Sequence, residues 1–402
     1  MASLGTIVVA GASLAGFNAA LALRKDGFTG RLVIVGDEPH KPYDRPPLSK
    51  DHLAGKVGDE ALRLPGAEAL DAEAVEWRLG APAVGLELRQ RRVHLADGAE
   101  LGFDGLVIAT GCRARTLPGA APRPGLHVLR TLDDSRAVRA EIDAGARRVV
   151  VVGAGFIGAE VAATCRELGC EVAMVEALPV PLERAVGAEV GQVIADVHRD
   201  HGVDVRLGVG VAGIEGEQRV ERVRLSDGEA LAADLVVVGI GVAPAVAWLD
   251  GSGLELADGV VCDETCLAAP GVVAAGDVAR WPNRAFGGEV MRVEHWDNAV
   301  AMGAHAARRL LAGAGPGEPY APVPWFWSDQ YDRKIQLAGR VRADDEVRIV
   351  NGSVEERRFA AIYGRAGRLV GVFGMNRPRH VMQYRKLIED GASWEDALAF
   401  GG

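Results

Sequence analysis

The chain has 402 residues, of which 49% are hydrophobic and 25% are charged. This size predicts two or three globular domains rather than one core. The formal charge of −10 argues against a nucleic-acid-binding protein, which needs a basic surface, and no uninterrupted apolar run is long enough to cross a bilayer.

Residues 6–38 have the pattern of a strand–turn–helix–strand unit that binds a dinucleotide. An apolar strand runs into Gly11 and Gly16, and Ser13 stands where this pattern has its middle glycine. Ser13 keeps the backbone farther from a phosphate, but its hydroxyl is able to hydrogen-bond that phosphate. Asp37, with Glu38 as second choice, is placed to accept the ribose hydroxyls.

A second and more complete unit occupies residues 149–176. Gly153 permits the tight turn, Gly155 permits close approach of a pyrophosphate, and Gly158 permits close packing of helix on strand. The helix that follows presents unpaired N–H groups to the phosphate, and Glu176 ends the second strand. Two such units predict two bound dinucleotides.

The segments between and after these units indicate how the domains are arranged. The apolar strand at 106–111 completes the first parallel sheet, and residues 113–125 read as a linker. Residues 234–244 close the second unit. The buried strand expected at 271–277 returns the chain to the first domain, and a helix is expected at 298–311.

The C-terminal part has a different texture. From about Trp325 the sequence alternates like antiparallel strands, and a short helix is expected near 378–390. This tail predicts a separate α+β domain.

The cysteines form no C-x-x-C pair, and their number is odd. Cys262 and Cys266 could be a redox pair or half a metal site, but no second His or Cys cluster follows them. We therefore expect small, partly buried thiols in a reducing cytoplasm and no metal site.

Four segments in order carry a family resemblance: PYDRPPLSK at 42–50, LVIATG at 106–111, GVVAAGD at 271–277 and WFWSDQYD at 325–332. With the two nucleotide units, the chain resembles the oxygenase-coupled NADH-dependent ferredoxin reductases. These flavoproteins have the glutathione reductase fold and serve Rieske dioxygenases and bacterial cytochromes P450.

The resemblance implies an α/β fold with two Rossmann-like dinucleotide-binding domains and a C-terminal α+β domain. The expected boundaries are 1–112 with 245–322 for a discontinuous FAD-binding domain, 113–244 for the NAD-binding domain and 323–402 for the C-terminal domain.

The resemblance also implies which residues hold FAD. Asp277 would accept a hydrogen bond from the ribityl chain and Lys50 would lie beside the flavin near N5, although a turn cap and a surface lysine are the plainer alternatives. The implied FAD contacts are Gly11, Ser13, Ala15, Gly16, Asp37, Lys50, Ala83, Arg130, Asp277 and Trp296.

For NADH, Glu160 would approach the nicotinamide. The Glu176 carboxylate disfavours a 2′-phosphate by about 1 to 4 kcal/mol, so NADH is preferred over NADPH. Arg184 would face the nucleotide or pair with Glu183 or Glu189. The implied NAD contacts are Gly153, Gly155, Ile157, Gly158, Glu176, Arg184 and Gly241.

The cofactors FAD and NADH would carry the chemistry, because hydride transfer needs proximity more than an acid–base pair. The implied catalytic residues are Lys50, Glu160 and Trp327, and Trp325 or Trp327 would form an aromatic wall at the flavin unless both are domain-interface core. Without a disulfide relay, electrons would pass singly to a [2Fe-2S] ferredoxin. Its docking patch is expected at Arg308, Arg309, Arg333 and Lys334.

Other functions remain open at this point. The same fold would suit an NADH oxidase or a reductase of rubredoxin. It would also suit an NADH-sensing flavoprotein similar to apoptosis-inducing factor, although the long extra segments of that protein are not seen here.

Overall fold

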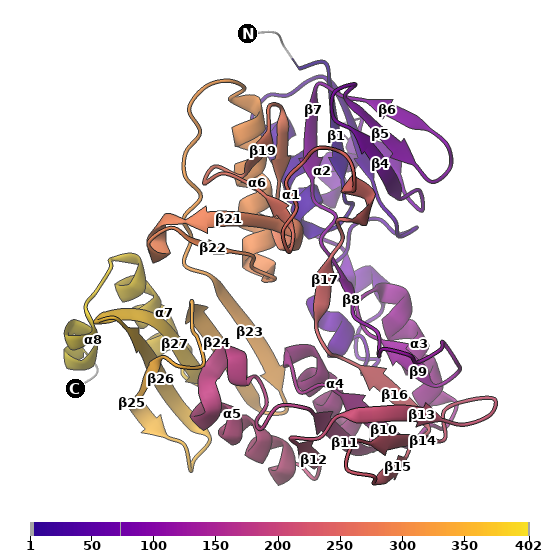
Figure 1. Cartoon of the computed structure of the whole chain (residues 1–402), viewed down its shortest axis with the longest axis vertical. Helices are drawn as coiled ribbons and strands as arrows, with labels where there is room; N and C mark the ends of the chain where they lie inside the picture. Colours follow the sequence, from indigo (N-terminus) through magenta and orange to yellow (C-terminus); the bar gives the residue numbers. More distant parts are fainter. Residues whose placement is uncertain (1–3, 73, 401–402) are drawn as a thin grey trace. The chain divides into compact units, whose positions relative to one another are not determined.

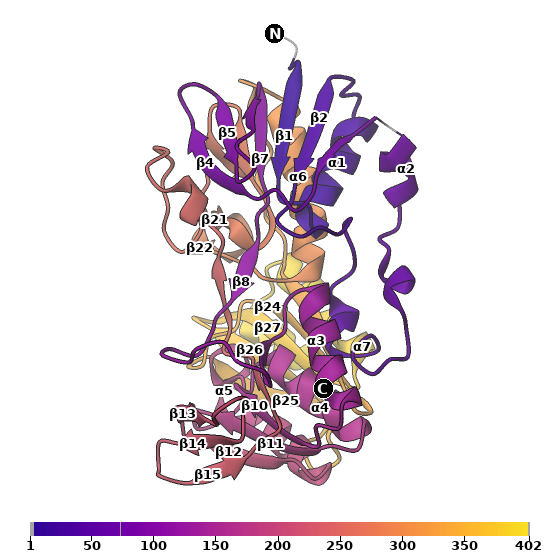
Figure 2. The same cartoon turned by 90° about the vertical axis from the view of Figure 1, so that its right-hand side faces the viewer.

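The computed structural model describes residues 4–72 and 74–400. The chain forms two compact units, each assembled from segments far apart in sequence (Figures 1 and 2). Unit 1 consists of Met1–Asp44, Leu62–Arg113 and Ala243–Trp325, and unit 2 consists of Arg45–Ala61, Ala114–Val242 and Phe326–Gly402. Strands β8 (Cys112–Ala114) and β17 (Val242–Pro244) lie where the chain passes from one unit to the other.

Unit 1 is built on a six-stranded sheet with the order β19-β20-β7-β1-β2-β3. All neighbouring strands are parallel except β19, which runs antiparallel to β20. The expected return of the chain to this sheet is confirmed by the pairing of β20 with β7. The strands are β1 (Thr6–Ala10), β2 (Arg31–Val35), β3 (Glu76–Arg78), β7 (Gly105–Ile108), β19 (Leu267–Ala269) and β20 (Val272–Ala274).

Helices α1 (Leu14–Lys25) and α6 (Trp296–Leu311) pack tightly on each other in unit 1. Gly303 makes this possible, because a Cβ there would collide with the carbonyl oxygen of Ala15. The helix expected at 298–311 is thus found and begins two residues earlier. The smaller elements are α2 (Ala67–Ala72), β4 (Ala83–Glu87), β5 (Arg92–Leu95), β6 (Glu100–Gly102), η3 (Ala247–Leu249), β18 (Val260–Val261), η4 (Gly276–Val278), β21 (Ala279–Asn283), η5 (Arg284–Phe286) and β22 (Glu289–Met291).

Unit 2 contains a five-stranded parallel sheet with the order β12-β11-β10-β16-β9. Its Val-rich central strands are buried, as expected when both faces of a parallel sheet are covered. A three-stranded antiparallel meander, β13-β14-β15, precedes β16. The elements are β9 (Leu126–Val128), α3 (Leu132–Asp143), β10 (Arg148–Val152), α4 (Phe156–Glu167), β11 (Glu171–Glu176), α5 (Glu183–Asp200), β12 (Asp204–Leu207), β13 (Val211–Glu215), β14 (Arg222–Leu225), β15 (Ala230–Ala232) and β16 (Leu235–Val238).

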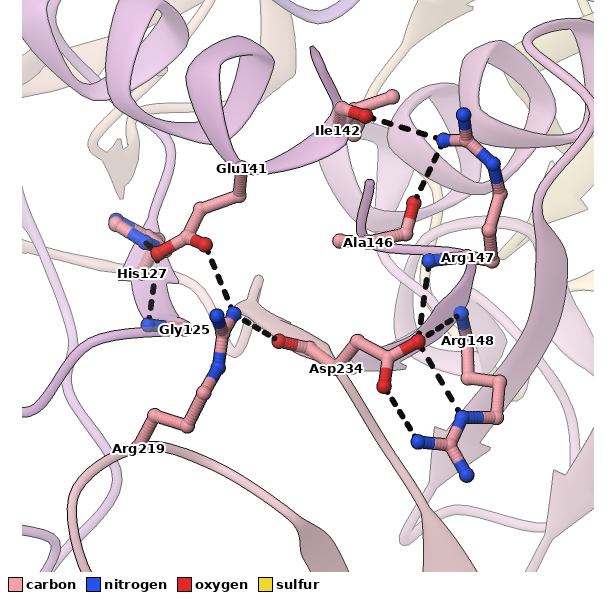
Figure 3. Close-up of polar contacts among 9 residues, drawn as sticks. All are labelled: Gly125, His127, Glu141, Ile142, Ala146, Arg147, Arg148, Arg219 and Asp234. Carbon is pink, nitrogen blue, oxygen red and sulfur yellow. Dashed lines mark hydrogen bonds and ion pairs between the residues drawn. The ribbon is translucent and has the colours of Figure 1, made fainter. Parts of the chain in front are cut away.

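A polar network ties together the amino ends of this sheet (Figure 3). Asp234, directly before β16, accepts the backbone N–H groups of Arg147 at 3.1 Å and Arg148 at 2.9 Å, and pairs with the Arg148 guanidinium. Arg219 donates to the Asp234 carbonyl at 3.0 Å and to the Glu141 carboxylate of α3 at 2.9 Å. These contacts fix the start of β10 beside the start of β16.

The C-terminal segment forms an antiparallel sheet with the order β23-β24-β27-β26-β25, which confirms the expected change of texture. The sheet packs on α5, and the Tyr363 hydroxyl donates to the Val186 carbonyl at 2.8 Å. Its elements are β23 (Trp325–Gln330), β24 (Arg333–Gly339), β25 (Glu346–Ser353), β26 (Arg358–Arg365), β27 (Arg368–Met375), α7 (Pro378–Glu389) and α8 (Trp394–Phe400).

Residues 45–61 leave unit 1 and pack within unit 2. This segment includes η1 (Pro46–Ser49), and η2 (Asp59–Leu62) lies at its end. The Leu48 carbonyl accepts the Ser135 hydroxyl at 2.9 Å, and the Ser49 carbonyl accepts the Thr164 hydroxyl at 2.8 Å. The sequence boundaries placed this segment inside 1–112, because side-chain hydrogen bonds to a distant helix leave no local pattern.

No helix among residues 4–72 and 74–400 has both the length and the hydropathy needed to cross a membrane.

Candidate functional site

The glycine loop of unit 1 is shaped by its own packing. Gly11 has φ of +126°, and a Cβ there would collide with the backbone of Ala109. A Cβ on Gly16 would collide with the carbonyl oxygen of Gly11. Ser13 is the extended N-cap residue of α1, so it lies where a phosphate would meet the helix N-terminus.

The AAGD loop lies against the same helix end. A Cβ on Gly276 would be 2.8 Å from the Ala15 Cβ, so Asp277 follows directly after this close approach. The Asp277 carbonyl accepts a hydrogen bond from Arg292 at 3.2 Å. The structure therefore brings together the segments that carry three predicted FAD contacts: Ser13, Ala15 and Asp277.

The other predicted FAD contacts are more dispersed. Asp37 is largely exposed and pairs with Arg113 at 3.9 Å, and Trp296 donates from Nε1 to Asp44 at 2.7 Å. Ala83 begins β4 in unit 1, whereas the Arg130 carbonyl accepts from Arg45 within unit 2. Their roles stay predictions.

The glycine loop of unit 2 leaves room for a ligand. Gly153 has φ of +98°, and a Cβ on Gly153 or on Gly158 would collide with backbone carbonyl oxygens. Gly155 differs, because the nearest protein atom to its Cβ would be the Gly239 carbonyl oxygen at 3.8 Å, an ordinary contact. Packing does not require this glycine, but close approach of a pyrophosphate does. Ile157 is 46% exposed on the first turn of α4.

Glu176 is fixed beside this loop. Its carboxylate accepts the backbone N–H of Ala154 at 2.8 Å and that of Leu178 at 2.9 Å. Glu176, the acid expected to bind the ribose, thus also stabilises the turn through these two hydrogen bonds. Gly241 has φ of +92° with no atom near its missing Cβ.

Arg184 is exposed on α5 and forms no ion pair with Glu183 or Glu189 in the described chain. Its alternative interpretation as a surface ion-pair partner is therefore not borne out.

Glu160 is the centre of a buried polar cluster within unit 2. Its side chain is 4% exposed and accepts from Lys50 Nζ at 2.8 Å, Ser49 Oγ at 2.5 Å and Ser328 Oγ at 2.7 Å. A buried carboxylate needs such charge and hydrogen-bond compensation. The cluster joins the PPLSK segment, the helix after the nucleotide loop, and the WFWSDQ segment.

These three donors leave the Glu160 carboxylate little capacity to accept further hydrogen bonds. A carboxylate has about four acceptor positions. Oε2 receives Ser49 and Lys50, and Oε1 receives Ser328. One position on Oε1 therefore remains for a further donor, a role for which the carboxamide of a nicotinamide is chemically suited.

Strand β23 presents two faces. The Phe326 ring meets the Phe156 ring of α4 at 4.3 Å, and Ser328 reaches Glu160 from the same face. Because side chains alternate along a strand, Trp327 points to the opposite face. The structure therefore does not bring Trp327 together with Glu160, and the proposed role of Trp327 at a flavin stays a prediction.

The expected basic patch needs one correction. Arg309 is buried, donating to the Thr265 hydroxyl at 2.9 Å and the Gly313 carbonyl at 2.9 Å, because it lies on the covered face of α6. It cannot present its charge to a partner. Arg308, Arg333 and Lys334 pair with Asp26, Asp332 and Asp329.

None of the five cysteines forms a disulfide within the described residues, and all five are buried. Burial raises the pKa of Cys262 to about 12 and that of Cys266 well above the usual thiol value. Both thiols stay protonated and unreactive at neutral pH, more deeply buried than the sequence suggested.

Sequence reasoning missed Ser49 and Ser328 as site residues. Each lies inside a segment that carried the resemblance, next to Lys50 or Trp327. The position of these hydroxyls within the motifs was the available signal, but their meeting at Glu160 depends on tertiary structure.

Comparisons with known proteins agree with this architecture. Residues 5–303 match the family described as pyridine nucleotide-disulphide oxidoreductase, and residues 325–400 match the reductase C-terminal family. The chain is 39% identical to rhodocoxin reductase of Rhodococcus erythropolis over 95% of this chain and 89% of that protein. It is 36% identical to putidaredoxin reductase of Pseudomonas putida over 96% and 92%.

A solved structure has the same fold. The covalent putidaredoxin reductase–putidaredoxin complex superposes with a TM-score of 0.90 at 34% identity, covering 96% of this chain and 93% of that chain.

Proposed function

The chain belongs to the pyridine nucleotide-disulphide oxidoreductase family, and from this premise we propose that it is an FAD-dependent NADH:ferredoxin reductase. Its partner is a [2Fe-2S] ferredoxin that supplies a cytochrome P450 or a Rieske oxygenase. Relatives named as ferredoxin reductase components of oxygenase systems support this assignment. The family resemblance of the sequence is thereby confirmed.

The observation that carries the proposal is the Lys50–Glu160 pair with its two serines. It links the two segments most specific to the resemblance to the helix that begins at the nucleotide loop. Such a cluster is a costly feature for a structural protein, because burying charges rarely adds stability over apolar packing. A site that must orient a nicotinamide beside a flavin accounts for it.

The two glycine loops fit the two dinucleotides. Gly155 leaves space for a pyrophosphate at the N-terminus of α4, and Glu176 favours a free ribose 2′-hydroxyl. Bound FAD would supply the chemistry for taking a hydride from NADH and for passing electrons on one at a time. The protein holds Lys50 in place with Glu160 and leaves an acceptor position on that carboxylate for the nicotinamide amide.

No cysteine is suited to relay electrons, since the five thiols are buried. We therefore expect electrons to pass to ferredoxin without a thiol intermediate. Cysteines that form no disulfide within the described residues also support our placement of the protein in the cytoplasm. The exposed Arg308 and Lys334 are the members of the expected patch best placed to steer an acidic ferredoxin.

The test is reduction of the purified yellow protein by NADH, followed by cytochrome c reduction through a panel of [2Fe-2S] ferredoxins. We expect rapid bleaching by NADH, slow bleaching by NADPH, and turnover that depends on ferredoxin. Fast bleaching with turnover only through rubredoxin or oxygen would show that the electron acceptor is not a [2Fe-2S] ferredoxin. No bleaching would refute the enzymatic assignment.

A further inference from the structure

A row of buried polar side chains continues from Glu160 along one face of β23. Ser328 donates to Glu160 at 2.7 Å, and Gln330 Nε2 donates to Ser328 Oγ at 3.1 Å. Ser328 and Gln330 are both 0% exposed. The row thus extends two residues along one face of the strand without reaching solvent.

The row goes on to α5. His198 is fully buried, and its Nδ1 lies 2.9 Å from the Tyr331 hydroxyl. Gln330 Oε1 and His198 Nε2 are buried atoms, and neither has a hydrogen-bond partner within the described residues. The contact of Gln330 with His198 opposes the lowering of the His198 pKa by burial. A hydrogen bond between these two atoms would satisfy both of them.

The position of each proton along the row can be deduced by starting from Glu160. Glu160 faces Lys50 and two hydroxyls, so its carboxylate accepts and Ser328 must donate to it. Ser328 then accepts from Gln330 Nε2, which turns Gln330 Oε1 toward His198. That oxygen needs a donor, so the proton of neutral His198 is on Nε2, and Nδ1 accepts from Tyr331.

The charge states agree with this order. Burial lowers the pKa of His198 to about 4, so the imidazole is neutral at pH 7 with one donor and one acceptor. Burial also raises the pKa of Tyr331, which keeps its hydroxyl as a donor. The other titratable groups around this end are His201, stacked on the Tyr331 ring at 3.7 Å, Arg166 and the buried Cys165.

The backbone at the far end of the row makes a tight turn at Tyr331. Tyr331 has φ of +54°, a left-handed conformation that a tyrosine rarely adopts. Tyr331 lies in the two-residue turn between β23 and β24, a place where a positive φ is common, and the stacking on His201 and the contact with His198 hold its ring.

We propose that Tyr331, His198, Gln330 and Ser328 form a one-directional hydrogen-bond chain that positions the Glu160 carboxylate. Every member donates toward Glu160, so each bond polarises the next. The chain fixes Oε1 with its remaining acceptor position toward the nucleotide. These are positioning residues, and this role in nicotinamide binding rests on the proposed function.

The first test detects the hydrogen-bond chain directly and does not depend on enzyme activity. In protein labelled with 15N-histidine, NMR of the His198 ring is expected to show a protonated Nε2 and an accepting Nδ1. Ser328→Ala should shift the Nε2 resonance although it lies two hydrogen bonds away, and Ser328→Thr should restore it. A protonated Nδ1, or a resonance unmoved by Ser328→Ala, would overturn the proposal.

The second test reads the effect on the nucleotide. Tyr331→Phe should raise the dissociation constant for NADH about fivefold, the equivalent of one lost hydrogen bond, with a smaller change in kcat. Tyr363→Phe is the matched control, because it removes a buried hydroxyl bond to Val186 in the same unit outside the chain. Equal effects of both variants would reduce the chain to a structural role.

The two tests separate the possible failures. A His198 tautomer as expected in a protein that NADH does not reduce would refute the proposed function and leave the chain intact. Normal reductase activity with the opposite tautomer would refute the chain alone. If Ser328→Ala does not fold, Gln330→Met serves for the same NMR comparison.

Discussion

The two nucleotide units repeat each other in detail at the amino ends of their sheets. Asp104 before β7 accepts the N–H groups of Gly5 and Thr6, each at 2.8 Å, just as Asp234 accepts those of Arg147 and Arg148 (Figure 3). Each unit has a three-stranded meander before this strand, β4-β5-β6 in unit 1 and β13-β14-β15 in unit 2. An arginine between the first two strands of each meander, Arg91 or Arg219, donates to the carbonyl of that aspartate. The two sheets therefore use the same arrangement of an aspartate and an arginine to fix the starts of their strands.

The carboxyl ends of the sheets differ. Val35 pairs with Ala10, and Val175 pairs with Val152, so Gly36 is the positional equivalent of Glu176. A Cβ on Gly36 would be only 2.6 Å from the Ala12 Cβ, which leaves no space for a side chain. The acid of unit 1, Asp37, comes one residue later. The residues that the sheet requires are repeated, whereas the acids expected to meet the two dinucleotides stand at different positions.

The largest effect is expected from the glycines that packing requires. Gly153→Ala places a Cβ against the Gly239 carbonyl at positive φ and should cost about 3 kcal/mol of unfolding free energy in urea. Gly155→Ala should cost less than about 0.5 kcal/mol, yet weaken NADH binding about tenfold. Equal losses of stability would contradict this division between scaffold and ligand glycines.

Substitutions of Glu176 test the carboxyl end of the unit 2 sheet, where the two units differ. Glu176→Arg should lower the ratio of kcat/KM for NADH to that for NADPH by about a hundredfold, because the repulsion of a 2′-phosphate becomes attraction. Glu176→Gln, which keeps the shape, should lower it about tenfold. Asp37→Asn serves as the control and should leave the ratio unchanged. An unaltered ratio in Glu176→Arg would show that this residue does not contact the ribose.

A substitution of Asp234 tests the amino end of the unit 2 sheet, where the two units are alike. Its hydrogen bonds and the Arg148 guanidinium lower its pKa in the folded protein. Its contribution is therefore full above its unfolded pKa of about 4 and is lost as pH falls below that value. Asp234→Asn should cost about 2 kcal/mol at pH 7, and the difference from the wild type should narrow at pH 3. Urea denaturation at both pH values measures this, and a constant difference would refute the linkage.

The smallest effect on turnover is expected from the thiols. Cys262→Ala combined with Cys266→Ala should leave NADH-dependent ferredoxin reduction within about twofold, while costing roughly 2 kcal/mol for the lost packing. Steady-state rates at 25 °C check this, with thermal denaturation alongside. Lost turnover in a folded double variant would reinstate a sulfur relay.

Local patterns were sufficient for much of the fold. The glycine spacing of 11–16 and 153–158 and the Val-rich strands determine the two strand–turn–helix–strand units, because these features act between neighbours in the chain. The same holds for the alternation after Trp325, which gave the antiparallel sheet. The resemblance segments added the family, which the comparisons confirm.

Tertiary structure decided what depends on contacts between distant segments. Residues 45–61 pack in unit 2, Arg309 is buried rather than exposed, and the hydroxyls of Ser49 and Ser328 meet at Glu160. A side chain's partners across more than a hundred residues leave no periodicity to read. Sequence alone thus determined the nucleotide scaffolds, whereas only the folded chain decided which polar groups surround the buried carboxylate.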